Sequence, residues 1–185
     1  MTKQFDTLLI GKFYSAELVG IYQIVKEIAN ILAKLVDPIY QSIYPNLASL
    51  LASKKKLETK QMTIKISSYL TFAVFIFYVL FGLFGQLAVD IVFGKEFLYA
   101  YKVSLIYIIA VFIAIISLPL YPLQIAFGHA KQAFKNQVES TLAYIPILLI
   151  LTFYFELVGA SIAYIFYYLY ITRLRVALVK KEFQL

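Results

Sequence analysis

The sequence predicts an all-α integral membrane protein, a bundle of about five transmembrane helices that forms a single transmembrane domain over residues 1–185. Of the 185 residues, 62% are hydrophobic and 15% are charged, and the mean hydropathy is +0.82. A soluble domain is nearer half apolar and a quarter charged. The apolar residues lie in long uncharged runs with basic residues clustered between them. Because such a chain cannot cover its surface with polar groups, we expect hydrocarbon to be its solvent.

The first predicted helix, residues 17–53, carries a stripe of polar side chains among Ile, Val, Leu and Ala. Steps of three and four residues separate most members of this polar stripe, which are Gln23, Lys26, Glu27, Asn30, Lys34, Asp37 and Gln41. At about 100° per residue they occupy an arc of roughly 100° and extend about 27 Å along the helix. One narrow polar face therefore follows an otherwise apolar helix.

The second and third predicted helices, residues 62–89 and 98–128, contain the longest uncharged runs. The run 66–89 holds 24 residues, enough to cross a hydrocarbon core of about 30 Å. The run 103–128 includes Pro119 and Pro122, each of which removes a backbone donor and bends the helix. Strands are excluded because open sheet edges cannot sit in lipid and these runs lack barrel alternation.

The fourth and fifth predicted helices, residues 137–156 and 157–178, form a helical hairpin. Each contains an uncharged run of 16 residues, and the turn between them is Glu156-Leu157-Val158-Gly159. Gly159 and Ala163 are small residues four positions apart, a spacing that allows two helix backbones to approach closely. Pro146 adds a further bend.

The distribution of basic residues predicts the orientation of the bundle. Successive helices place eleven of them on one side: Lys54, Lys55, Lys56, Lys60, Lys65, Lys131, Lys135, Arg173, Arg175, Lys180 and Lys181. The opposite side holds Lys12, Lys95 and Lys102, with Lys3 if the chain has not re-entered the membrane there. Because cytoplasmic loops carry the excess of Lys and Arg, we predict a cytoplasmic C-terminus.

Two interpretations of the polar stripe compete. The first helix could lie flat on the membrane surface, or it could span the membrane with its stripe facing a water-filled cavity. The surface interpretation would break the alternation of the basic loops, so the cavity is favoured. Lys34 and Asp37 can pair at i,i+3 to reduce the cost of burying charge. The stripe then either lines water as a neutralised face or contacts a charged substrate or coupling ion.

The remaining signals exclude several classes of function. His129 is the only histidine and cysteine is absent, so metal sites and nucleophilic triads lack their residues. No Gly-rich phosphate loop occurs. We therefore expect no enzymatic activity and no cofactor. The net charge of +7 does not indicate nucleic-acid binding, because the basic residues flank apolar runs rather than forming one basic face.

Several short motifs resemble those of bacterial polysaccharide flippases. Residues 6–11, Asp-Thr-Leu-Leu-Ile-Gly, are followed by Val-Gly-Ile-Tyr at 19–22 and by Tyr-Pro-Asn-Leu at 44–47. Phe-Gly-Lys-Glu-Phe at 93–97 and Val-Gly-Ala-Ser-Ile-Ala at 158–163 are similar to a turn and a late helix start of that family. The order and spacing of these motifs resemble the oligosaccharide flippase branch of the multidrug/oligosaccharidyl-lipid/polysaccharide exporter superfamily.

The resemblance implies a two-lobed transporter that moves an oligosaccharide on a polyprenyl pyrophosphate carrier across the bacterial plasma membrane. The chain would be its C-terminal lobe, with about five spans plus the end of a sixth. Its expected partners are membrane lipids, the lipid-linked oligosaccharide and the missing N-terminal lobe. The resemblance also implies a cation-lined central cavity to which residues 23–41 contribute.

One departure and two alternatives remain. The stripe holds two lysines, one glutamate and one aspartate, so its net charge is zero. An anion site would need basic residues from elsewhere or local separation of these charges. The alternatives are a cation-coupled drug antiporter of the same superfamily, or a non-transporting membrane subunit of polysaccharide assembly.

Overall fold

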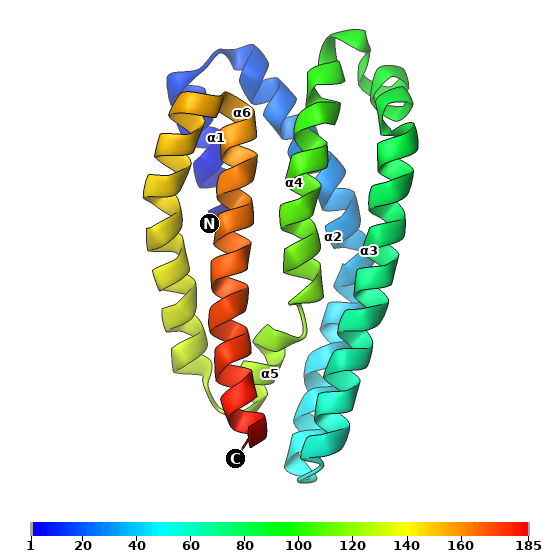
Figure 1. The fold of residues 1–185 in the computed structure, drawn as a ribbon, viewed down its shortest axis with the longest axis vertical. Helices are drawn as coiled ribbons and strands as arrows, with labels where there is room; N and C mark the ends of the chain where they lie inside the picture. The colour runs from blue at the N-terminus through cyan, green and yellow to red at the C-terminus, as the bar shows by residue number, and fades with distance from the viewer. Residues whose placement is uncertain (1, 185) are drawn as a thin grey trace.

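The computed structural model describes residues 2–184, except for the side chains of residues 2–5, 8 and 9, so the predicted placement of Lys3 falls outside it. Over this range the chain is helical, and no strand occurs (Figure 1). The elements are α1 (Thr2–Phe13), α2 (Ala16–Ala52), α3 (Lys56–Phe93), the 3₁₀ helix η1 (Lys95–Phe97), α4 (Leu98–Ile116), α5 (Leu120–Ala126) and α6 (Ala130–Gln184).

Three helical stretches are long and apolar enough to cross a membrane. Within the described residues they are Lys56–Phe93, Lys95–Ala126 and Ala130–Gln184. The polar stripe of α2 keeps that helix out of this set, although α2 has 37 residues. The predicted all-α membrane character is therefore confirmed, whereas the number of spans stays a prediction.

The predicted hairpin lies within α6. Glu156 has a φ of +49°, and at this residue the chain reverses so that two antiparallel limbs lie side by side (Figure 1). Gly159 lies just beyond the turn, where an added Cβ would come within 1.9 Å of the carbonyl oxygen of Leu151. Only glycine permits this approach of the two limbs, so the prediction of close backbone contact is confirmed.

The predicted single helix over residues 98–128 is divided in two. α4 ends at Ile116 and α5 begins at Leu120, with Pro119 capping the second helix. Between them, Leu118 N–H donates to Ile115 and Leu120 N–H to Ser117, so i→i−3 bonds replace the α-helical pattern. Pro119 cannot donate a backbone hydrogen bond, which explains why the chain breaks here and does not simply bend.

The connections gather at two ends of the bundle. The α2–α3 connection, the α5–α6 connection and the C-terminus lie at one end, whereas the α1–α2 connection, η1 and the turn of α6 lie at the other (Figure 1). This arrangement agrees with the alternation from which the orientation was predicted. The assignment of the first end to the cytoplasm remains a prediction.

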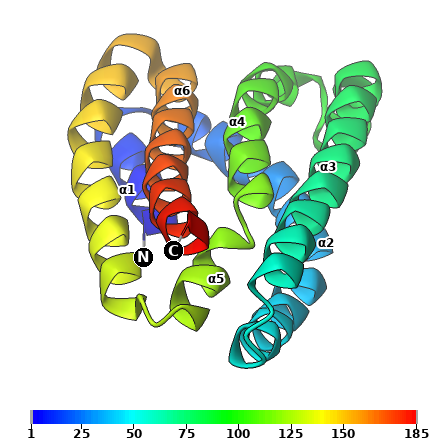
Figure 2. The same ribbon diagram turned by 60° about the horizontal axis from the view of Figure 1, so that its bottom comes forward.

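The packing leaves one helix at the periphery. α3 contacts α2 and α4 at the outer edge of the bundle and touches α6 near its own start, where Nζ of Lys56 donates to the carbonyl oxygen of Glu182 (Figure 2). Its outward face is apolar, with Phe72, Leu83 and Ile91 among its most exposed side chains. In contrast, α2 packs against α1, α3, α4 and α5, so its residues reach every part of the core. The polar stripe consequently runs along a helix that contacts four other helices of the fold.

Candidate functional site

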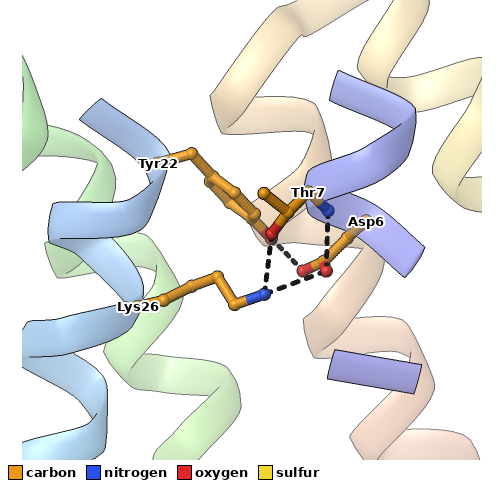
Figure 3. Close-up of polar contacts among 4 residues, drawn as sticks. All are labelled: Asp6, Thr7, Tyr22 and Lys26. Carbon is orange, nitrogen blue, oxygen red and sulfur yellow. Dashed lines mark hydrogen bonds and ion pairs between the residues drawn. The ribbon is translucent and has the colours of Figure 1, made fainter. Parts of the chain in front are cut away.

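A buried ion pair joins α1 to α2 at the start of the polar stripe. The Asp6 side chain is 0% exposed, and its Oδ1 lies 3.0 Å from Nζ of Lys26 (Figure 3). The hydroxyl of Tyr22 donates to Oδ2 of Asp6 at 2.7 Å, and the Lys26 ammonium also donates to Oγ1 of Thr7 at 2.9 Å. Tyr22 and Lys26 are four residues apart on one helix face, so both reach the same carboxylate.

A cluster of tyrosines surrounds this ion pair. The tyrosine cluster comprises Tyr22, Tyr107, Tyr144, Tyr164, Tyr167 and Tyr168, whose rings contact one another with centroids between 5.0 and 6.2 Å apart. These rings come from α2, α4 and both limbs of α6. The buried hydroxyls of Tyr144 and Tyr164 find no hydrogen-bond partner among the described residues. The core beside Asp6 is thus aromatic but rich in polar oxygen atoms.

A pocket of about 170 Å³ opens next to Lys26 between α2, α4 and α6. The alanines Ala29 and Ala33, one turn apart on α2, leave room for it. This α2 pocket is lined by Lys26, Ala29, Asn30, Ala33, Val36, Asp37, Tyr107, Val111, Ala114, Ile115, Leu118 and Tyr168. It therefore presents an ammonium, an amide, a carboxylate and two phenols in an otherwise apolar wall.

The structure divides the seven residues of the polar stripe between two environments. Lys26, Asn30 and Asp37 line the α2 pocket. The other four lie outside the pocket and are exposed: Gln23, Glu27, Lys34 and Gln41. Asp37 is exposed as well, although it lines the pocket. Whether any of the seven binds substrate stays a prediction.

The ion pair suggested between Lys34 and Asp37 is not the one that forms. Nζ of Lys34 lies 3.7 Å from Oε1 of Glu27, and both side chains are more than half exposed. Asp37 instead turns toward the α2 pocket. The i,i+3 rule brings Lys34 and Asp37 within reach of each other, but the packing of α4 and α6 draws one of them to the pocket side.

Arg175 is a candidate site residue that the sequence analysis placed only in the basic flank of the last helix. Its guanidinium carbon lies 5.3 Å from the ring centroid of Tyr121, and its Nη2 lies 3.5 Å from Oε1 of Gln137. Within the described part of the chain, no carboxylate pairs with it. Arg175 follows Tyr168 by seven residues, so both lie on one face of α6, two turns apart. Arg175 does not line the α2 pocket itself, but it lies on the same face of α6 as Tyr168, which does.

Asp6 is the other residue that sequence reasoning missed as a site component. The motif of residues 6–11 and the motif of residues 19–22 each contribute one partner of the Asp6–Tyr22 hydrogen bond. The presence of both motifs in one sequence is the signal from which the contact between Asp6 and Tyr22 could have been predicted. Helical periodicity carries no such information, because the contact joins two different helices.

Comparison with known proteins places the chain in a family. The profile of the family described as polysaccharide biosynthesis protein matches residues 1–102, which include Asp6, Tyr22 and the whole polar stripe. No curated protein and no solved structure matches the chain. The match agrees with the resemblance noted from the motifs and supports a role in polysaccharide biosynthesis at a membrane. This chain belongs to the polysaccharide biosynthesis protein family.

Proposed function

We propose that the chain is the C-terminal part of a flippase that moves a lipid-linked oligosaccharide across the bacterial plasma membrane during polysaccharide biosynthesis. The observation that carries this proposal is the α2 pocket, in which Lys26, Asn30 and Asp37 meet two tyrosines inside a membrane bundle. Charged and polar groups at such a depth are costly, so a pathway for a polar substrate accounts for them.

The pocket chemistry suits a sugar attached to a pyrophosphate. An ammonium such as that of Lys26 and the guanidinium of Arg175 attract phosphate oxygens, which lose hydration when they enter a low-dielectric region. The amide of Asn30 and the phenols of Tyr107 and Tyr168 offer hydrogen bonds to sugar hydroxyls. Although the stripe has no net charge, Arg175 adds a positive charge beside it.

The size of the pocket supports a second lobe. At about 170 Å³ it is smaller than the roughly 300–1,000 Å³ typical of a complete ligand site. We infer that the opposite wall comes from a second half of the transporter, because carriers of this kind place substrate between two moving halves. The Lys34–Glu27 pair and the exposed Gln23 and Gln41 would then face that half.

The proposal is tested by export in cells that lack their own flippase and express the complete transporter containing this chain. Asn30→Leu removes a polar group from the α2 pocket, and Gln86→Leu removes a side-chain amide at an exposed position of the peripheral helix α3 as a matched control. We expect export of surface polysaccharide to fall about tenfold or more only with Asn30→Leu, the loss expected from one buried hydrogen bond.

Four measurements decide the outcome, the fourth being drug resistance. Surface polysaccharide and lipid-linked oligosaccharide retained in the membrane report export, and immunoblots of the membrane fraction confirm equal protein levels. Normal export by Asn30→Leu at normal protein levels would argue against a substrate role for the pocket. Loss of drug resistance with unchanged polysaccharide export would instead favour a drug antiporter.

A further inference from the structure

A second open site lies on the outer surface of α6, apart from the α2 pocket. It is a groove of about 780 Å³ at the beginning of the first limb. This α6 groove is lined by Gly128, His129, Lys131, Gln132, Phe134, Lys135, Val138, Glu139 and Leu142. None of these residues lines the α2 pocket, so the two sites are independent.

The groove has an apolar part that runs along the helix. Phe134, Val138 and Leu142 are 71%, 40% and 64% exposed and follow one another at steps of four residues. They form one strip on one helix face, about 12 Å long. In a membrane protein, an exposed apolar strip of this kind is covered by acyl chains.

The groove also has a basic part, which overlaps the beginning of the strip in the chain, because Lys131 precedes Phe134 and Lys135 follows it. Lys131 and Lys135 are exposed and one turn apart. Two acidic groups lie nearby: Glu139, which lines the groove and accepts a hydrogen bond from the Tyr170 hydroxyl at 2.5 Å, and Glu182, which contacts His129 at 2.8 Å. Among the described residues, neither lysine has a carboxylate within ion-pairing distance. Two positive charges are therefore available to an anion at this end of the groove.

We propose that the α6 groove binds an anionic glycerophospholipid of the surrounding bilayer. The lipid phosphate lies between Lys131 and Lys135, and one acyl chain follows the strip from Phe134 to Leu142. The order of the residues matches the order of the lipid, because α6 starts at the end of the bundle where the loops and the C-terminus gather (Figure 1). The headgroup then sits at the membrane surface and the chain runs inward. A lipid bound here would hold the α5–α6 connection in place while the α2 pocket binds its substrate.

The test is lipid binding by the intact chain, purified in a mild detergent and titrated with dioleoyl phosphatidylglycerol or dioleoyl phosphatidylcholine. Native mass spectrometry counts the lipids bound. We expect the wild type to prefer phosphatidylglycerol. The double change Lys131→Ala/Lys135→Ala is expected to weaken phosphatidylglycerol binding about 10- to 30-fold and to leave phosphatidylcholine unchanged, given the usual contribution of a lysine at an anionic surface.

Two further variants keep the proposal falsifiable. Lys180→Ala/Lys181→Ala removes the same charge from exposed positions outside the groove and is expected to bind phosphatidylglycerol as the wild type does. Leu142→Ser is expected to weaken binding of both lipids, because it shortens the apolar strip. Equal affinity of the wild type for the two lipids would overturn the proposal. An equal loss of phosphatidylglycerol binding in the two double-lysine variants would also overturn the proposal. The effect would then depend on the overall charge of the protein and not on the groove.

Discussion

At the residue scale, Lys26 belongs to two environments at once. Its ammonium holds the buried carboxylate of Asp6 and the hydroxyl of Thr7, and the same side chain lines the α2 pocket. A buried carboxylate loses its hydration and requires a partner. A substitution of Lys26 therefore changes both the stability of the α1–α2 contact and the chemistry of the pocket, and an export assay alone cannot separate the two effects.

The stability effect of Lys26 can be isolated by removing its partner as well. We expect Lys26→Met to destabilise the protein by about 3–5 kcal/mol, because the buried carboxylate of Asp6 loses its ion pair with Lys26. Asp6→Asn/Lys26→Met removes the buried charge and should recover most of that loss. Thermal unfolding followed by circular dichroism in detergent measures both.

Lys34→Met is the matched control for these variants. Its ion pair with Glu27 is exposed, so the substitution should change stability by at most about 1 kcal/mol. If Lys26→Met and the double variant were equally unstable, the ion pair with Asp6 would not be the cause, and loss of packing by the lysine stem would explain the result.

The candidate site could be predicted from the sequence only in part. The 3.6-residue repeat identifies Lys26, Asn30 and Asp37 as members of one helix face, and all three line the α2 pocket. The repeat does not distinguish them from Lys34, which lies on the same stripe but does not line the pocket. That distinction depends on where α4 and α6 pack. Tyr107 and Tyr168 also line the pocket because α4 and α6 pack against α2. No local sequence pattern predicts such contacts between distant helices.

At the element scale, the hairpin in α6 was predictable and the break after α4 was not. A charged residue between two apolar runs, followed by Gly159, marks a turn in any membrane helix pair. Proline is ambiguous by comparison. Pro38, Pro45 and Pro146 all lie inside helices, whereas Pro119 lies in the break between two helices, as the N-cap of α5. Membrane helices tolerate proline when neighbours satisfy the freed carbonyl, so the outcome depends on packing.

Gly159 offers a direct test of the hairpin geometry. We expect Gly159→Ala to destabilise the protein by about 3 kcal/mol, because the new Cβ would press against the backbone carbonyl of Leu151 on the other limb. Gly82→Ala is the control, since a Cβ there meets nothing within 4 Å in the middle of α3. It should be neutral or stabilising by up to about 1 kcal/mol. Similar unfolding temperatures for the two variants would contradict the close approach of the limbs.

At the scale of the whole molecule, the loops separate into two groups at opposite ends of the bundle, and the C-terminus lies at one of these ends (Figure 1). The end that contains the α2–α3 connection carries Lys54, Lys55 and Lys56, and the C-terminus at the same end carries Lys180 and Lys181. This separation gives the orientation prediction a physical basis, because an excess of basic residues resists translocation.

The orientation is measurable with single cysteines, because the chain has none of its own. Cysteines at Ser53 and Gln184 are expected to react with an impermeant thiol reagent only from the cytoplasmic side. A cysteine at Glu156 should react only from outside; Glu156 is exposed, whereas its neighbour Leu157 is fully buried and would not react. Reaction of positions 53 and 156 from the same face would contradict the alternation of the helices.

The lengths of α2 and α3 have a consequence for the shape that the protein presents outside the bilayer. With 37 and 38 residues, each helix is about 55 Å long, whereas a bilayer with its headgroups measures about 40–45 Å. Unless both helices tilt steeply, their shared tip must project into water as a rigid two-helix stalk. The lysines at that tip then sit beyond the lipid surface, where they form the part of the molecule that a soluble protein on that side meets first.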